Sequence, residues 1–422
     1  MPNHCFAAQI FSSLFLLLAA AGPVRAQSGE TAAPQVTADD KGLGVKSADG
    51  LFSYRLRGLL QVDSRWFLGD DDLDDKDSFL LRRARPMLEA TVLEIVDLRL
   101  VPDFGEGDVD IDDAVIDVRS WSWLKLRLGK FKPPIGLERL QSDADMPLLE
   151  RGLTSNLSPS RDVGAQLFGE LLAGIVHYEI GVFNGAVDNA SDDTDKNHAK
   201  DFAGRVFVQP FATATWLGTL GLGVSLSTGK QSGTTSAPDL PTYKSAGQNA
   251  FFNYLTSSSD PNGTVIADGR RSRLNPELYY YLGGAGLLVE YIANRQNVSK
   301  GSDAADLTHH AWQATLSFAL GGKTCFDGVT PTHSYKSSPG GWGAAELAGR
   351  ISYLKLDDDT FPTYADDATT PREATGYGVA LSWHPSRNAR IAVQYERTNY
   401  DGAPSPTRTH EDALITRGQV TF

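Results

Sequence analysis

Hydrophobic and polar residues alternate along most of this chain, in stretches of roughly ten residues. A period of two places successive side chains on opposite faces of a β-strand. In the first stretch Phe52, Tyr54 and Leu56 share one face, while Arg55 and Arg57 share the other. Several later stretches repeat this alternation. The pattern predicts an all-β protein whose strands each have one apolar and one polar face.

The linkers between these stretches also follow a pattern, because long and short ones interleave. The predicted strands number sixteen, at 51–68, 79–92, 95–104, 112–120, 123–131, 161–172, 174–184, 199–211, 217–228, 269–282, 286–298, 308–320, 343–356, 374–384, 388–400 and 410–422. Long polar linkers are 69–78, 132–160, 185–198, 229–268 and 357–373, and tight ones are 93–94, 121–122, 173, 283–285 and 385–387. Linker 321–342 breaks this pattern, so either the strand count is wrong there or the turn is elaborated.

Long loops at one end and short turns at the other are typical of outer-membrane barrels. After residue 26 no apolar run is long enough for a membrane-spanning helix. We therefore expect 51–422 to form a sixteen-stranded antiparallel transmembrane β-barrel. A soluble β-rich periplasmic binding protein is the structural alternative, in which the apolar faces would pack as sandwich cores.

Residues 1–26 have the features of a secretory signal peptide. The apolar run Ile10 to Ala21 has signal-peptide length, and Val24-Arg25-Ala26 is a small-x-small cleavage site. Residues 27–50 are polar without a period, which predicts a flexible periplasmic segment. Only Cys325 remains after cleavage, so we expect neither an intramolecular disulfide nor a cysteine metal site. The predicted location is the bacterial outer membrane.

Acidic residues outnumber basic ones, and the whole chain has a formal net charge of −13. This balance argues against nucleic acid as a partner. Two acidic runs, 70–75 and 357–359, fall in long linkers, but they lack the Gly and terminal Glu of a calcium-binding loop. We interpret them as solvated external loops, with loose binding of divalent ions as the alternative. No cofactor is expected.

If the apolar faces contact lipid, the opposite faces line a channel and their charges set its selectivity. The predicted channel-lining cations of the first five strands are Arg55, Arg57, Arg83, Arg85, Arg99, Arg119, Lys125 and Arg127, and Arg65 has the same parity. Lys130, Lys132 and Arg161 flank linker 132–160. Arginine suits phosphate because its planar guanidinium makes paired hydrogen bonds and stays charged. The same parity points carboxylates such as Glu89 and Asp97 inward, so a balanced and weakly selective wall is the alternative.

Several motifs resemble the phosphate-selective porin O and P family. They are Phe79-Leu80-Leu81-Arg82-Arg83-Ala84-Arg85, Val101-Pro102-Asp103-Phe104, Asp112-Asp113-Ala114, Leu128-Gly129-Lys130-Phe131-Lys132-Pro133-Pro134-Ile135-Gly136-Leu137-Glu138, Arg161-Asp162-Val163-Gly164, Tyr178-Glu179-Ile180-Gly181-Val182-Phe183-Asn184-Gly185, Gly340-Gly341-Trp342-Gly343-Ala344-Ala345-Glu346-Leu347-Ala348-Gly349-Arg350 and the terminal Phe422. The motifs occur in order over most of the chain and are densest between 79 and 185.

This resemblance implies a homotrimer of sixteen-stranded barrels in the outer-membrane lipid. It also implies that a third loop, here about 132–160, folds inward as a constriction loop. Lys130, Lys132 and Arg161 resemble the family's narrow basic site by their position in the motif. The expected function is diffusion of small anions, with phosphate or polyphosphate as candidates. The alternative is a general porin for small hydrophilic solutes.

An outer-membrane enzyme and a sugar-conducting channel are two further interpretations of the sequence. An outer-membrane enzyme would need a nucleophile with an oriented histidine, and the chain has no Gly-x-Ser-x-Gly elbow, so no catalytic residue is predicted. A sugar-stacking path would need several aromatic side chains in the channel. Tyr279 and Tyr281 have the required parity, so this path stays open. The tryptophans near strand ends are interpreted as an interfacial girdle.

Overall fold

The computed structural model describes residues 33–69, 77–195, 198–336, 339–406 and 408–422. The predicted signal peptide and the acidic run 70–75 lie outside the described residues. Within the described part, no helix is both long enough and apolar enough to cross a membrane.

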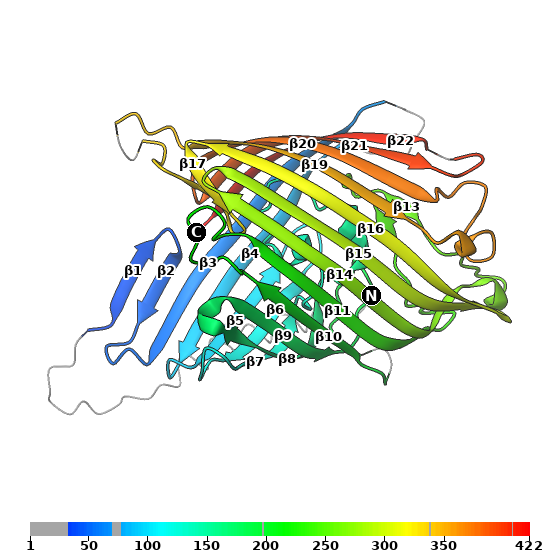
Figure 1. The fold of residues 1–422 in the computed structure, drawn as a ribbon, viewed down its shortest axis with the longest axis horizontal. Coiled ribbons are helices and arrows are strands. Elements are labelled where there is room, and N and C mark those ends of the chain that lie inside the picture. Colours follow the sequence, from blue (N-terminus) through cyan, green and yellow to red (C-terminus); the bar gives the residue numbers. More distant parts are fainter. Residues whose placement is uncertain (1–32, 70–76, 196–197, 337–338, 407) are drawn as a thin grey trace, which may run out of the picture.

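Sixteen antiparallel strands close into a barrel, as the alternation predicted (Figure 1). They are β3 (Phe52–Phe67), β4 (Ser78–Val92), β5 (Val96–Asp103), β6 (Asp110–Val118), β7 (Lys125–Phe131), β8 (Asp162–Leu171), β9 (Val176–Phe183), β10 (Asp201–Val208), β11 (Gly221–Ser232), β14 (Ile266–Leu282), β15 (Ala285–Lys300), β16 (Asp303–Leu320), β19 (Ala344–Lys355), β20 (Glu373–Ser386), β21 (Ala389–Asp401) and β22 (His410–Thr421). Each pairs with its neighbour in the chain, and β22 closes the barrel on β3 with Thr421 opposite Leu59.

The strand faces separate as the period of two requires. Leu60, Val62, Leu316 and Phe318 are exposed on the outer surface, whereas Gln313 is fully buried inside. Apolar side chains exposed around a closed barrel are stable only where lipid covers them. The apolar faces therefore form the lipid-facing belt.

Two predicted strand boundaries differ from the structure because the strands continue past the belt. β15 and β16 run on to Lys300 and Asp303, so the loop between them has only two residues. The predicted strands, 286–298 and 308–320, stop short of this turn. A strand can extend beyond the bilayer, and its outer face is then polar because it meets water.

Residues 33–50 lie within the predicted flexible periplasmic segment 27–50, but they form regular structure. β1 (Gln35–Asp39) and β2 (Gly42–Lys46) form a hairpin, and β2 pairs with the first residues of β3. The hairpin projects from the end of the barrel that carries the short turns (Figure 1). It is held there by a hydrogen bond of 2.6 Å from Asn388 Nδ2 to the Asp40 carbonyl.

Linker 321–342 is an elaborated turn and hides no barrel strand. β16 pairs directly with β19, and the linker adds a small hairpin of β17 (Gly322–Cys325) and β18 (Gly328–Pro331). We call residues 322–331 the inner hairpin, because its tip reaches the barrel interior. The Phe326 ring at the tip lies 5.5 Å from the ring of Tyr279, which shares a strand face with the buried Tyr281. The strand count of sixteen is therefore correct at its weakest point.

The long linker 233–265 also folds against the barrel interior. It contains β12 (Tyr243–Lys244), β13 (Ala250–Phe252) and the short 3-10 helix η3 (Pro261–Gly263). The Tyr243 and Phe252 rings stack at 5.1 Å, and the Tyr254 hydroxyl lies 2.9 Å from Nε2 of His309. Two further 3-10 helices, η2 (Leu172–Gly174) and η4 (Asp358–Thr360), occupy other linkers.

Candidate pore constriction

The linker 132–160 lies inside the barrel, and we call it the constriction loop. Pro133 and Pro134 follow its first residue, Lys132, and Gly136 adopts a φ of 87°, which glycine reaches at little cost. The loop continues through the short helix α2 (Leu137–Leu140) and the 3-10 helix η1 (Leu153–Leu157). Most of its residues are buried, so the loop is a packed part of the interior.

Polar side chains of the barrel wall satisfy the backbone of the constriction loop. The Gly136 N–H donates to Asn275 Oδ1 at 2.9 Å, and the Leu149 N–H donates to Gln394 Oε1 at 2.5 Å. Arg390 donates at 2.6 Å to the Met146 carbonyl. Irregular backbone needs such partners when it is buried away from water. These bonds fix the loop against strands β14 to β22.

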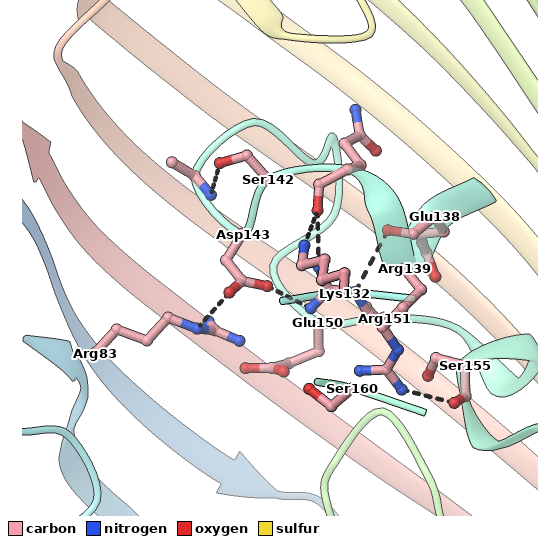
Figure 2. Close-up of polar contacts among 12 residues, drawn as sticks. Arg83, Lys132, Glu138, Arg139, Ser142, Asp143, Glu150, Arg151, Ser155 and Ser160 are labelled. Atoms are coloured by element: carbon pink, nitrogen blue, oxygen red, sulfur yellow. Dashed lines mark hydrogen bonds and ion pairs between the residues drawn. The ribbon is translucent and has the colours of Figure 1, made fainter. Parts of the chain in front are cut away.

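Asp143 holds the other side of the loop through three arginines, as Figure 2 shows in part. It lies 2.5 Å from Arg85 and 3.3 Å from Arg83, and it also pairs with Arg151 of the loop itself. Burial raises the pKa of Asp143, but the three guanidinium groups outweigh burial and hold this pKa well below its ordinary value. Asp143 is therefore a fixed anion that joins the loop to β4.

Glu150 is the second carboxylate that fixes the loop. It accepts a bond of 2.7 Å from Arg82 and one of 2.9 Å from Arg417, and Arg65 lies 3.7 Å away. Burial raises the pKa of Glu150, and Arg82 and Arg417 more than reverse that effect. Because strands β3, β4 and β22 supply these arginines, Glu150 ties the loop to the seam where the barrel closes.

Other cations around the loop have no such partner. Among the described residues, Lys132 and Arg139 make no ion pair with a carboxylate: Lys132 donates at 2.8 Å to the Gln141 carbonyl, and Arg139 donates at 2.6 Å to the Ser155 carbonyl. Burial and the nearby charges of Arg151 and Arg161 lower the pKa of Arg139 to about 9 and hold the pKa of Lys132 well below its ordinary value. Like charges therefore crowd the base of the constriction loop.

Below the loop, toward the short turns, ion pairs line the wall from β3 to β8. Arg99 lies 2.7 Å from Asp113, and Arg127 lies 2.8 Å from Asp117. The other pairs are Arg57 with Glu89, Arg119 with Asp97, and Lys125 with Glu170. The cations of these pairs are half-buried to exposed, whereas inward residues such as Arg350 on the opposite wall are buried. Solvent thus reaches the interior along β3 to β8.

Comparison with known proteins agrees with this geometry. Residues 52–422 match the family described as phosphate-selective porin O and P. The chain belongs to this porin family. Porin O of Pseudomonas aeruginosa is 24% identical over 430 residues, which cover 90% of this chain and 91% of the relative.

Solved outer-membrane proteins have a similar fold. The channel DcaP of Acinetobacter baumannii has a TM-score of 0.57 at 10% identity, covering 89% of this porin and 99% of that chain. An anion-selective porin from Comamonas acidovorans has a TM-score of 0.54 at 11% identity, covering 88% and 100%. This porin is accordingly a protein of the bacterial outer membrane.

The structure divides the predicted site residues of this porin into two groups. Arg83, Arg85, Lys130, Lys132 and Arg161 lie around the constriction loop, where Lys130 pairs with Asp193 at 2.5 Å and Arg161 lies 3.2 Å from Asp112. The remaining six lie nearer the short turns, and these are Arg55, Arg57, Arg99, Arg119, Lys125 and Arg127. Ten of the eleven pair with a carboxylate, and within the described part of the chain Lys132 is the exception.

Sequence reasoning missed several arginines at the constriction. Arg350, Arg390 and Arg417 of the later strands contact the loop, but the predicted cations came from the first five strands and the ends of the loop.

Arg82, Arg139 and Arg151 were missed for other reasons. The pairing of β3 with β4 shifts register between Gln61 and Val62, and this bulge lets Arg82 point inward beside Arg83. Strict alternation of the two faces would place Arg82 on the lipid-facing side. Arg139 and Arg151 lie in an irregular loop, where no period predicts the direction of a side chain.

Proposed function

We propose that this porin conducts small anions through a water-filled passage between the constriction loop and the wall from β3 to β8. Two cations at the base of the loop that form no ion pair among the described residues support this proposal most directly. Lys132 and Arg139 have no carboxylate partner in the described part of the chain, and Arg151 and Arg161 lie close enough to perturb both. Burial and the neighbouring cations disfavour the charged forms of both groups, and an anion beside them would favour those forms, so this narrow site attracts anions.

The exposure of the ion pairs below the loop supports the same conclusion. In the pair Arg99–Asp113 the cation is 44% exposed and the acid 12%, and in Arg127–Asp117 the values are 27% and 14%. Arg57 and Arg119 are also more exposed than their acids, whereas Lys125 and Arg55 are less exposed than theirs. A permeating ion therefore meets more guanidinium than carboxylate along most of this wall.

Phosphate or polyphosphate is the proposed substrate class within the anions. The support is chemical, because guanidinium and ammonium groups are the usual partners of phosphate oxygens. The family also supports it, because its description names phosphate-selective porins.

Reversal potentials in planar bilayers test the proposal. Under a KCl gradient we expect anion preference, and Lys132→Gln should reduce the anion-to-cation permeability ratio while Lys132→Arg preserves it. Lys355→Gln is the matched control, because Lys355 lies near the end of β19 and pairs with Glu373 far from the loop. Added phosphate should reduce the chloride current of the unmodified porin.

A general, weakly selective porin is the second candidate, and the pairing of ten of the eleven predicted cations favours it. That candidate predicts a permeability ratio near one and no response to Lys132→Gln. Anion preference without a phosphate effect would reject phosphate as the substrate and retain the anion channel.

We also propose that this porin functions as a homotrimer. The support is indirect: a similar fold occurs in OmpT of Vibrio cholerae, whose solved structure is described as a trimer form, with a TM-score of 0.52 at 12% identity.

A further inference from the structure

An apolar groove of about 670 Å³ crosses the outer surface of strands β9, β10, β11, β14 and β15. Ile180, Phe202, Leu226 and Leu274 form its raised sides, and all four are exposed. Gly204, paired with Leu226 and Ile180, leaves the space between them open. Because these residues belong to the lipid-facing belt, the groove opens to the hydrocarbon of the membrane.

The groove becomes polar toward the end of the barrel that carries the long loops. The next cross-strand positions in that direction are Thr228, Ser272 and Arg295, which also line the groove. Two residues further along the same face, Lys230 of β11 lies directly opposite Arg270 of β14. The apolar groove thus ends at three exposed cations, Lys230, Arg270 and Arg295.

The charges at this end are not balanced within the protein. Arg295 pairs with Asp306, but Lys230 and Arg270 make no ion pair with any carboxylate of the described residues, and exposed Asp268 lies two residues from Arg270. Like charges directly opposite each other destabilise a pair of strands. An external anion between Lys230 and Arg270 would remove that repulsion.

We propose that this outer face binds a phosphate-bearing lipid of the outer leaflet. One acyl chain lies in the groove between Phe202 and Leu274, and a phosphate of the headgroup lies between Lys230 and Arg270. An apolar groove at membrane depth accepts an acyl chain because burial there removes no contact with water, and basic side chains at headgroup level attract lipid phosphates. The site lies outside the barrel and is independent of the permeating ion.

Native mass spectrometry of the detergent-purified porin tests this proposal. The probes are a diphosphorylated, multiply acylated glycolipid and the same glycolipid without phosphate. The double variant Lys230→Gln/Arg270→Gln should bind the phosphorylated probe about tenfold or more weakly than the unmodified porin. Gly204→Leu should also weaken it, because the position has room for a side chain that would fill the groove.

The matched control is Lys355→Gln/Arg397→Gln, which removes two exposed cations of the outer wall that already pair with Glu373 and Asp412. Its binding should equal that of the unmodified porin, as should the reversal potential and heat-modifiable migration of every variant. Equal binding of both probes, an equal loss in the control, or no effect of Gly204→Leu would overturn the proposal. The proposal would also fail if millimolar inorganic phosphate displaced the probe and binding did not depend on acyl-chain length. It would fail as well if the variants changed the number of subunits and not the amount of bound lipid.

Discussion

At the residue scale, the inward-facing arginines differ mainly in which carboxylate neutralises each of them. Six arginines converge on two carboxylates of the constriction loop: Arg83, Arg85 and Arg151 on Asp143, and Arg65, Arg82 and Arg417 on Glu150. Counting cations in such a wall overestimates its field, because a paired guanidinium contributes little at a distance. The field at the constriction depends on the few groups left without a partner.

Asp143→Asn tests the structural part of this arrangement. Removing one member of a buried ion-pair cluster typically costs about 3–5 kcal/mol, so we expect a lower thermal midpoint of the porin. The same change removes a negative charge from the constriction, so the anion-to-cation permeability ratio should rise. Asp97→Asn is the control, because Asp97 pairs with Arg119 in a solvent-exposed position, where ion pairs stabilise little. An unchanged midpoint and ratio for Asp143→Asn would contradict this role.

Mild acid should not weaken the attachment of the constriction loop through Asp143. Because the folded-state pKa of Asp143 lies well below its unfolded value, its contribution is fully present above the unfolded pKa. That contribution is lost only as the pH falls through the depressed folded value. The difference in thermal midpoint between the unmodified porin and Asp143→Asn should therefore stay the same from pH 5 to pH 8.

Asp145 should behave in the opposite way. Burial and, less strongly, Asp327 of the inner hairpin raise the pKa of Asp145 to about 6, against the opposing effects of Ser142, Arg387 and Arg390. This carboxylate therefore becomes charged as the pH rises through about 6, and its ionisation weakens the fold between its unfolded pKa and that value.

Bilayer recordings from pH 5 to pH 7 measure this titration. The anion-to-cation permeability ratio should fall as the pH rises, with a midpoint near the Asp145 pKa of about 6. Asp145→Asn should remove that part of the pH dependence. If the variant keeps the full change, other groups of the channel cause it.

At the element scale, three segments enter the barrel: the constriction loop, linker 233–265 and the inner hairpin. They contact one another, because Asn156 donates at 2.9 Å to the Lys244 carbonyl and Gln141 donates at 2.7 Å to the Phe326 carbonyl. Together they bury the inward side chains of strands β14 to β22. The passage is left on the side of the shorter strands β5 to β8.

Shortening the inner hairpin tests its part in narrowing the passage. Replacing residues 322–331 with a two-residue Asn-Gly turn should keep the barrel, because β16 and β19 pair up to Leu320 and Ala345 without it. Single-channel conductance should increase, because Phe326 would no longer occupy the interior. Phe326→Ala should give a smaller increase. A conductance equal to that of the unmodified porin would show that the hairpin lies outside the ion path.

At the scale of the whole molecule, the net negative charge and the proposed anion preference are compatible. Many of the acids lie in linkers, such as the run at 357–359, and others neutralise arginines within the wall. Charge in an external loop affects capture at the mouth, and salt screens it within about 8 Å at physiological ionic strength. Charge buried at the constriction is screened much less.

The proposed assembly makes a prediction at the same scale. The porin should be recovered in the outer-membrane fraction and should migrate as a trimer on gels before heating and as a monomer afterwards. Closed barrels with satisfied backbone hydrogen bonds resist detergent at room temperature, which is why heating is needed. Recovery as a soluble periplasmic protein would contradict the membrane assignment, and a single monomeric band before heating would contradict the trimer.

The sequence alone determined the barrel, its strand number, its two faces and the ends where long and short linkers lie. These follow from a local rule, since a period of two and the width of the bilayer act on each strand separately. Even the exception at 321–342 was visible, although its inner hairpin was not. The inward direction of Arg55, Arg99 and Arg127 came from the same rule.

Only the tertiary structure decided which charges neutralise one another. Arg417 and Asp63 are separated by 354 positions, and Arg350 reaches Glu138 across 212. The bulge that turns Arg82 inward breaks the period, and the loop that carries Arg139 and Arg151 has none. Lys132 shared its predicted role with ten other cations, and it differs from them because it forms no ion pair with a described carboxylate and donates to the Gln141 carbonyl instead.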